Sequence, residues 1–395
     1  MKILTVSSDF PQPDQASGDL RFYTLLSLLA RKHKLLFFAV GKNGTAQPRN
    51  EASEWLERAD ITLGEIDLLH VLKNFKPDIV WFEFYDEVRQ DFLGLLQRHC
   101  PSARIVVDSV DVHFNRFEAK ARLTGKPEDE AAAIEVKKRE LAAYASADMV
   151  IAVSEDDKKL IYRELPGTHV EVIPNIHVMP TYPDQKKRRY GELVFVGAFK
   201  HDPNVDAMLY FCRNVMPLIA EDHPEIRLKI IGSNPPQAIS ELESPHIEVL
   251  GYVPETAPYL ESAYISVAPL RYGGGMKGKV GEAMSYGLPV VTTTFGAEGF
   301  GLETGRDLLI GDSAETFASQ VISLLNDANL HGRIALSGYE FIAKHYSVST
   351  VGHMLESSIQ QLTHLPFRKI SLPLRSLALA HQLYSRHVAW RLSKK

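Results

Sequence analysis

The sequence is poor in cysteine, lacks long apolar runs and has no strong excess of one charge. Its 395 residues include two cysteines, Cys100 and Cys212, which we place in different domains, so a disulfide framework is not expected and a reducing compartment fits. No apolar stretch approaches the roughly 18 residues of a membrane-spanning helix. The opening MKILTVSSDF has too short an apolar segment for a signal peptide. We expect a cytoplasmic or membrane-peripheral protein.

The charge balance argues against a nucleic-acid partner. The chain has 44 basic and 49 acidic residues, a net charge of -5, whereas nucleic-acid-binding domains usually carry a basic surplus. Its 45% hydrophobic and 24% charged residues are typical of a folded protein. The length exceeds what one hydrophobic core usually supports, so we expect two domains.

Short apolar runs alternate with longer helical patterns along the whole chain. We expect strands at 2–8, 35–40, 78–84, 104–110, 149–154, 170–175, 192–199, 227–233, 247–253, 265–270 and 289–293. Nearly continuous apolar strands separated by helices are typical of parallel sheets covered on both faces.

The segment 176–190, IHVMPTYPDQKKRRY, has no usable periodicity and reads as a linker. We therefore predict an N-terminal domain over 1–178, a C-terminal domain over 179–362 and a tail over 363–395. The fold class is α/β, with two Rossmann-like βαβ domains. Because open α/β sheets bind ligands beyond the carboxyl ends of their strands, we expect the domains to face each other across a cleft.

A glycine-rich loop in the second domain predicts an anion site. The stretch 268–300, APLRYGGGMKGKVGEAMSYGLPVVTTTFGAEGF, reads as strand, loop, helix and strand, with the helix beginning near Lys277. Glycines let the backbone approach a ligand closely, and a helix N-terminus directs unpaired N–H groups at a phosphate. Lys277 and Lys279 would add positive charge. The alternative is an ordinary surface loop with solvated lysines.

This stretch resembles a known family. The residues GEAMSYGLPVVTT, together with ASADMVIAVSEDDKKLI (145–161), VIPN (172–175) and ELVFVGAFKHDPNVDAM (192–208), resemble in order and spacing the group 1 glycosyltransferases, the retaining GT4-like branch of the GT-B fold. The resemblance covers about residues 1–362. It implies that Glu282 binds the ribose hydroxyls of a donor nucleotide, since a carboxylate accepts two hydrogen bonds from a vicinal diol. The alternative is that Glu282 merely stabilises the first turn of its helix.

The sequence departs from the family at three positions. The family's earlier Glu falls at Gly274, and the Arg and Lys that cradle the diphosphate fall at Ala198 and Pro203. We therefore assign the phosphate role to the two lysines of the loop, with Lys200 as a further candidate. The expected donor-binding residues are Gly18, Gly197, Lys200, Gly274, Gly275, Met276, Lys277, Lys279 and Glu282.

Two segments of the first domain carry further candidates. Ser17, Gly18 and Asp19 follow the first strand and open a helix. In resembling proteins this loop meets acceptor and donor phosphate; the alternative is a helix start with Ser17 as N-cap. In VVDSVDVHFNRFE (106–118), the resemblance places His113 near the reacting sugar, although a lone histidine is often structural. We expect Ser17, Asp19 and Asp111 to bind the acceptor. We expect no metal, although His113, Asp108 and Asp111 could superficially suggest ligands.

Two charged stretches need a separate interpretation. The acidic and basic run from Glu128 to Glu140 reads as a solvated helix face. After His364 the chain carries seven Lys or Arg and no acidic residue. This tail is either an amphipathic helix on an anionic membrane or a terminal helix packing back across the first domain.

The resemblance implies a retaining, metal-independent glycosyltransferase without a cofactor. Its partners would be a nucleotide-diphosphate sugar and a glycan or lipid-linked acceptor. The expected catalytic residues are His113, Lys277 and Lys279, which would act mainly through electrostatic stabilisation of the departing diphosphate. Two alternatives stay open: a catalytically silent glycosyltransferase-like binding subunit, and a GT-B-fold sugar-nucleotide epimerase.

Overall fold

The computed structural model describes residues 1–14, 17–41, 45–64, 67–273 and 275–367. The chain divides into two compact units. Unit 1 comprises Met1–Gln12, Phe22–Ile173 and, of the described residues, 354–367; unit 2 comprises Pro13–Arg21 and Pro174–His353. Two of the boundaries between the units fall inside helices. Residues 17–21 of the helix Ser17–Ala30 and residues 348–353 of the helix Val348–His364 belong to unit 2, and the rest of each helix belongs to unit 1. The predicted boundaries at 178 and 362 remain predictions, and most of the predicted tail lies outside the described residues.

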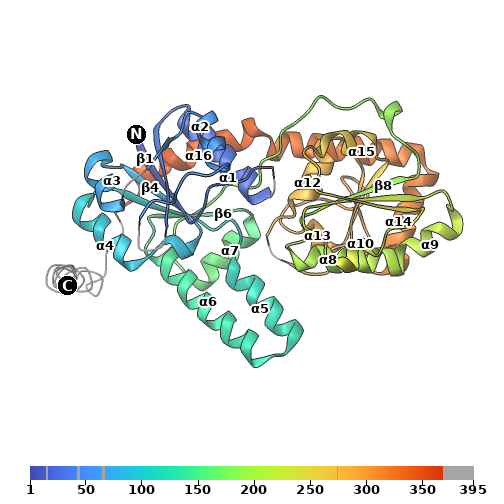
Figure 1. Ribbon diagram of the computed structural model, residues 1–395, viewed down its shortest axis with the longest axis horizontal. Helices are drawn as coiled ribbons and strands as arrows, with labels where there is room; N and C mark the ends of the chain where they lie inside the picture. Colours follow the sequence, from blue (N-terminus) through green and yellow to red (C-terminus); the bar gives the residue numbers. More distant parts are fainter. Residues whose placement is uncertain (15–16, 42–44, 65–66, 274, 368–395) are drawn as a thin grey trace. The chain divides into compact units, whose positions relative to one another are not determined.

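Unit 1 is built on a seven-stranded parallel sheet in the order β3-β2-β1-β4-β5-β6-β7. Figure 1 labels β1, β4 and β6 of this sheet. The strands are β1 (Lys2–Ser7), β2 (Lys34–Ala39), β3 (Thr62–Leu63), β4 (Ile79–Glu83), β5 (Arg104–Asp108), β6 (Met149–Ala152) and β7 (Val170–Val172). The helices are α1 (Ser17–Ala30), α2 (Ser53–Arg58), α3 (Leu68–Phe75), α4 (Gln90–His99), α5 (His113–Thr124), α6 (Pro127–Ala145), α7 (Glu155–Glu164) and α16 (Val348–His364).

Burial explains the sheet of unit 1. Every residue of β4 and β5 is buried, as expected for strands covered on both faces. Ile3 of β1 pairs with Leu35 on one side and Ile79 on the other. From β1 the chain adds β2 and β3 on one side and then β4 to β7 on the other, so the topological switch point, where open α/β sheets bind ligands, lies between β1 and β4.

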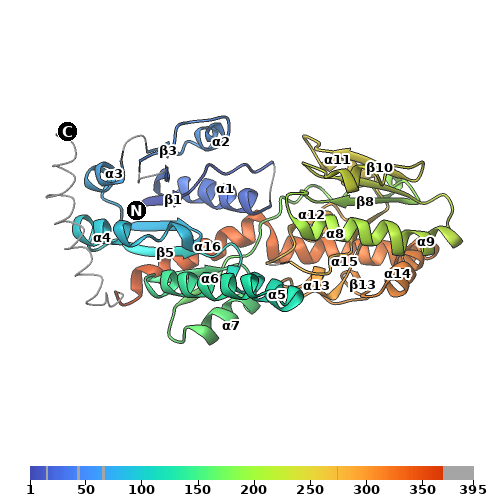
Figure 2. The same ribbon diagram turned by 60° about the horizontal axis from the view of Figure 1, so that its bottom comes forward.

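Helices α5 and α6 lie side by side as a hairpin in unit 1, which both views show (Figures 1 and 2). Phe114 and Tyr144 at the sheet end of this hairpin have no exposed surface and join the hydrophobic core. The far end of the hairpin is exposed around Gly125, whose φ of +60° ends α5. The hairpin is thus anchored at the end that carries His113.

Unit 2 is built on a six-stranded parallel sheet in the order β10-β9-β8-β11-β12-β13. The strands are β8 (Glu192–Val196), β9 (Arg227–Ile231), β10 (Ile247–Gly251), β11 (Ile265–Ala268), β12 (Val290–Thr292) and β13 (Leu309–Ile310). The helices are α8 (Asp202–Tyr210), α9 (Met216–Asp222), α10 (Gln237–Ser240), α11 (Ala257–Ser262), α12 (Gly278–Ser285), α13 (Thr294–Ala297), α14 (Ala314–Asn326) and α15 (Ala328–Tyr346), with a π-helical segment over Phe211–Val215. Its switch point lies between β8 and β11.

The predicted α/β class with two parallel-sheet domains is confirmed. Each of the eleven expected strand segments contains a strand, whereas the two-residue strands β3 and β13 were not expected. Within the described ranges, no helix is long and apolar enough to span a membrane.

The segment 176–190 is more firmly held than a linker would need to be. Arg188, in its basic run, is buried and donates hydrogen bonds to the backbone carbonyls of Leu260, Ala263, Tyr286 and Gly287. Burial lowers the pKa of Arg188 to about 10. The guanidinium therefore joins the segment to α11 and α12, because its five N–H donors can reach several carbonyls at once.

Candidate functional site

The glycine-rich loop lies directly after β11, at the switch point of the sheet in unit 2. Gly273 has a φ of +139° and Gly275 a φ of +60°, values that L side chains rarely adopt. The loop leads into α12, which begins at Gly278. The prediction of a strand, a glycine-rich loop and a helix is confirmed here, while Gly274 lies outside the described residues.

The N-terminus of α12 is closely lined by polar groups of unit 2. A Cβ on Gly278 would lie 2.6 Å from Cβ and 2.8 Å from Oγ of Ser17, so glycine alone leaves room for this serine. Asn175 is buried and donates a hydrogen bond to the carbonyl of Met276 at 3.2 Å. The structure therefore brings Ser17, an expected acceptor-binding residue, beside the expected phosphate loop. Gly18 and Asp19 follow Ser17 in the first turn of α1 and are partly buried.

Lys277 is buried, which rules out the alternative of a solvated lysine. Its Nζ donates to the carbonyl of Gly275 at 2.6 Å and lies 4.1 Å from the ring centre of Phe295. Glu298 lies 3.8 Å from the same amine. These contacts join the glycine-rich loop to the segment that carries Phe295 and Glu298. The role of Lys277 in binding a phosphate stays a prediction.

Lys279 lies in the first turn of α12, and its amine is held by a neutral side chain. Nζ donates to Oδ1 of Asn204 at 2.6 Å and lies 5.3 Å from the ring centre of Phe195. Burial, and then the charge of Lys277, lower the pKa of Lys279 to about 7, while Glu282 acts in the opposite direction. A lysine near its midpoint at neutral pH can gain a proton when an anion arrives.

Glu282 lies on the same helix and is partly buried. One carboxylate oxygen, Oε1, accepts a hydrogen bond of 2.6 Å from Oγ1 of Thr256. Burial raises the pKa of Glu282, and the Thr256 hydrogen bond and Lys279 oppose that rise. The hydroxyl thus orients the carboxylate and engages one oxygen, while the second oxygen can accept from a ligand.

The two remaining candidates of unit 2 differ in burial. Gly197 follows β8, where a Cβ would lie 2.9 Å from Nδ2 of Asn204 and 3.0 Å from Cε of Lys279. Lys200, three residues later, is exposed. Gly197 therefore belongs to the packing around Lys279, whereas no hydrogen bond or ion pair among the described residues holds Lys200 near that group.

In unit 1, Asp111 and His113 form one cluster at the start of α5. His113 Nε2 lies 2.6 Å from Oδ1 of Asp111, and Arg116 approaches the other oxygen at 3.3 Å. The imidazole packs against Phe84 and Tyr85, with ring centres 5.5 and 5.3 Å away. The carboxylate fixes the orientation of the imidazole. The structure thus brings together two residues that the sequence assigned separately to catalysis and acceptor binding.

Glu140 corrects one interpretation of the sequence. The run from Glu128 to Glu140 was expected to be a solvated face, but Glu140 has no exposed surface. Its carboxylate accepts hydrogen bonds from the backbone N–H of His113 at 3.1 Å and of Phe114 at 2.7 Å, and from the Tyr144 hydroxyl at 2.5 Å. It satisfies otherwise unpaired N–H groups at the start of α5. The charge pattern alone could not reveal this, because the partner lies on another helix.

A further polar pair marks the switch point of unit 1. Ser7 ends β1 and donates a hydrogen bond of 2.5 Å to Glu83, which ends β4, and both side chains are buried. The sequence reasoning did not single out either residue, although both stand at expected strand ends.

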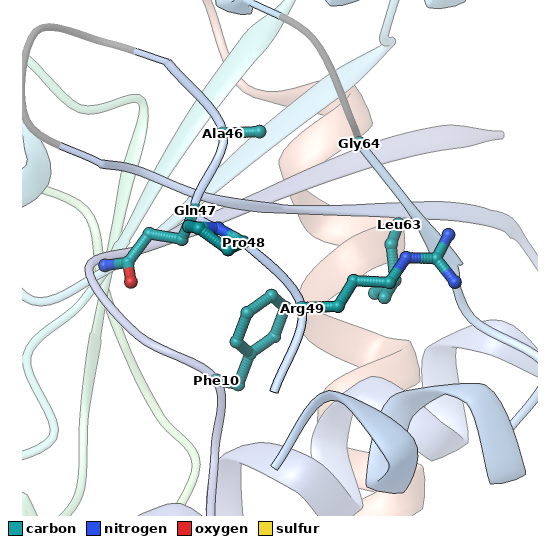
Figure 3. Close-up of a pocket in the computed structure, with 7 residues that line it drawn as sticks. All are labelled: Phe10, Ala46, Gln47, Pro48, Arg49, Leu63 and Gly64. Atoms are coloured by element: carbon teal, nitrogen blue, oxygen red, sulfur yellow. The ribbon is translucent and has the colours of Figure 1, made fainter. Parts of the chain in front are cut away.

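Unit 1 also has a cavity of about 260 Å³ away from these residues (Figure 3). Its lining residues are Phe10, Ala46, Gln47, Pro48, Arg49, Leu63 and Gly64. Gln47 donates to the carbonyls of Ser8 and Val40, and Arg49 pairs with Glu57 at 2.6 Å. Because its polar side chains are already engaged, we assign this cavity no role.

Comparison with known proteins defines the class. The family model described as Glycosyl transferases group 1 matches residues 191–327. The structure of HepE from Anabaena in complex with UDP and glucose is similar with a TM-score of 0.66, at 14% identity over 91% of this chain and 99% of that one. Sucrose-phosphate synthase from Thermosynechococcus elongatus is similar with a TM-score of 0.66, at 15% identity over 92% of this chain and 99% of that one. The fold is therefore GT-B.

A curated relative adds a more limited match. An uncharacterized 44.6 kDa protein in the cps region of Klebsiella pneumoniae is 26% identical over 219 residues, which are 52% of this chain and 55% of the relative. The chain thus matches about half the length of that relative. The match to the group 1 glycosyl transferase model thus lies within unit 2, and the solved structures share the fold of the whole chain.

Proposed function

We propose that this glycosyltransferase moves a sugar from a nucleotide-diphosphate sugar to a glycan or lipid-linked acceptor, with retention at the anomeric carbon, as the GT4-like resemblance implies. The observation that carries the proposal is the carboxylate of Glu282, which Thr256 holds through one oxygen on the helix that also presents Lys279. An oriented carboxylate suits the two hydroxyls of a ribose.

The comparisons suggest the first donor to test. HepE has been crystallised with UDP and with UDP-glucose, and its similarity to this chain covers both units. At 14% identity this supports the fold and not the base. UDP-sugars are therefore the first candidates, ahead of other nucleotide sugars.

The diphosphate would bind at the N-terminus of α12. Backbone N–H groups of the glycine-rich loop and the helix dipole favour an anion there, and Lys279 supplies a charge-assisted hydrogen bond of about 1.5–3 kcal/mol. Gly275 and Met276 would contribute backbone contacts, and Lys277 a nearby positive charge. We propose that this cationic environment takes the role that a divalent cation has in other folds, so activity should survive a chelator.

Catalysis would be mainly electrostatic. As the bond to the sugar breaks, negative charge grows on the departing diphosphate, and fixed N–H donors with Lys279 stabilise it without reorganisation. His113, oriented by Asp111, would act near the reacting sugar, and Ser17, Asp19 and Asp111 would contact the acceptor. The basic tail over 363–395 remains either a membrane-binding segment or a packed helix, which binding to anionic lipid vesicles would distinguish.

Donor turnover tests the proposal directly. Purified protein is incubated with UDP-glucose and related nucleotide sugars in EDTA, with and without a crude glycan or lipid acceptor, and proton NMR follows the anomeric signals. The proposal predicts acceptor-dependent consumption of one donor and a product with the donor's anomeric configuration. Epimerised sugar and free nucleotide without acceptor would instead indicate an epimerase. Nucleotide binding without any turnover would indicate a silent binding subunit.

A further inference from the structure

Asn204 is a buried amide that joins two parts of unit 2. It lies in the first turn of α8, with 5% of its surface exposed. Nδ2 donates to the carbonyl of Ala198 at 2.7 Å, and Oδ1 accepts from Nζ of Lys279 at 2.6 Å. A carbonyl can only accept and an ammonium can only donate, so these partners fix the orientation of the amide.

Two glycines make room for this contact. A Cβ on Gly197 would come within 3.0 Å of the Asn204 amide and of the Lys279 side chain. A Cβ on Gly232 would lie 2.0 Å from the carbonyl oxygen of Gly197. These strand ends therefore approach each other so closely that the asparagine and lysine side chains can meet beside them. The contact between Asn204 and Lys279 is thus part of the packing at the carboxyl ends of β8 and β9.

The partner of the Lys279 amine, the Asn204 amide, carries no charge. The charged groups near its amine are Lys277 and Glu282, both on the same segment, while Asn204 of α8 and the Phe195 ring of β8 are neutral. A carboxylate at 204 would neutralise the ammonium. An amide holds the ammonium in place and leaves its charge available, with two further N–H donors after the one given to Oδ1.

We propose that Asn204 is a positioning residue that presents the Lys279 ammonium to the diphosphate of the bound nucleotide. This rests on the proposed function, because it assumes that the nucleotide binds beside α12. It also suggests why Ala198 and Pro203 can lack the basic side chains that the resemblance places there. The lysine reaches the phosphate site from α12, and Asn204 orients it from the first turn of α8.

The test separates phosphate binding from binding of the rest of the nucleotide. Uridine, UMP and UDP are titrated by ligand-observed NMR and calorimetry into wild type, Asn204→Ala and Asn204→Asp. Asn329→Ala, an exposed asparagine on α15, is the matched control. We expect UDP affinity to fall about tenfold in Asn204→Ala and further in Asn204→Asp, while uridine binding changes less than about twofold.

The outcomes are distinct. Equal losses for uridine, UMP and UDP would show that Asn204 only supports the fold, and would overturn the inference. UDP binding by both variants at wild-type strength would overturn it as well. If Asn204→Ala fails to fold, the nearly isosteric Asn204→Asp decides, since it keeps the side-chain volume, gives up the donor to Ala198 and adds a negative charge beside the amine. Failure of wild type itself to bind any of the three ligands would contradict the proposed use of a uridine nucleotide, not the role of Asn204 alone.

Discussion

Donor binding should draw a proton onto Lys279. In the free protein, burial and the charge of Lys277 lower the pKa of Lys279 to about 7. At pH 8 such a lysine is only about one-tenth protonated. A diphosphate placed beside it favours the charged form and raises the pKa towards the ordinary value for lysine. Binding at pH 8 should therefore take up about 0.9 proton, whereas binding at pH 6 should take up about 0.1.

The sign of the pH dependence follows from this linkage. The bound state holds more protons than the free state between the lowered pKa and the bound pKa, so affinity falls as pH rises through that window. The loss should approach tenfold per pH unit above about pH 7.5. Below about pH 6 the amine is already charged in the free protein, and affinity should no longer change with pH through Lys279.

Calorimetry measures the uptake directly. UDP-glucose is the ligand of choice, because its diphosphate has no ionisation near neutrality, and the titration is repeated at pH 8 in HEPES and Tris buffers, which hold no phosphate to compete for the site. The observed enthalpies should differ by about 0.9 times the difference in buffer ionisation enthalpy. Lys279→Met should remove this difference, and the exposed Lys159→Met should keep it. Enthalpies that do not depend on the buffer at pH 8 would refute the reasoning.

Three further substitutions probe the surroundings of the site. Thr256→Val removes the hydroxyl that orients Glu282, and should reduce UDP affinity by about three- to tenfold and shrink its preference for UDP over 2′-deoxy-UDP. Gly281→Ala places a Cβ 2.2 Å from Nε2 of the buried His177, and should lower the free energy of unfolding by about 1–3 kcal/mol in urea denaturation. Glu140→Gln leaves a backbone N–H without its acceptor, and should cost about 1–3 kcal/mol of stability in the same assay.

The two stability variants each have a matched control in the chain. Gly332→Ala, on α15 where an added Cβ meets no atom within 4 Å, should be neutral or slightly stabilising. Glu135→Gln, an exposed residue of α6, should change stability by less than about 0.5 kcal/mol. A Glu140→Gln variant as stable as Glu135→Gln would contradict the role given to Glu140 at the start of α5. A Thr256→Val protein with unchanged sugar preference would show that the hydroxyl does not orient Glu282.

The sequence predicted the elements whose signal is local. Apolar runs such as IVWFE over β4 are long enough to indicate buried parallel strands, and glycines before a lysine-bearing segment marked the start of α12. β3 and β13 were missed because two residues carry no periodicity. Their pairing depends on neighbouring strands, which a window along the chain does not contain.

In the candidate site, too, residues of one local motif could be predicted, whereas their partners from distant segments could not. Glu282 and Lys279 could be proposed from a motif within one segment, but Asn204 lies 75 residues from Lys279 and Thr256 lies 26 residues from Glu282. Neither partner has a composition that distinguishes it from an ordinary cap or turn residue. Glu140 was misread because a charged helix pattern does not show which face is covered by a second helix. Contacts between segments that are distant in the sequence therefore could not be predicted from local patterns.

The most direct test of the account is a titration of wild type and Glu282→Ala with UDP, GDP and a panel of nucleotide sugars, without added metal. We predict that wild type binds one nucleotide in the absence of metal and that Glu282→Ala loses most of this affinity while remaining folded. Binding of equal strength in the variant would contradict the assignment of Glu282 to the ribose. No binding of any nucleotide by wild type would contradict the proposed donor site as a whole.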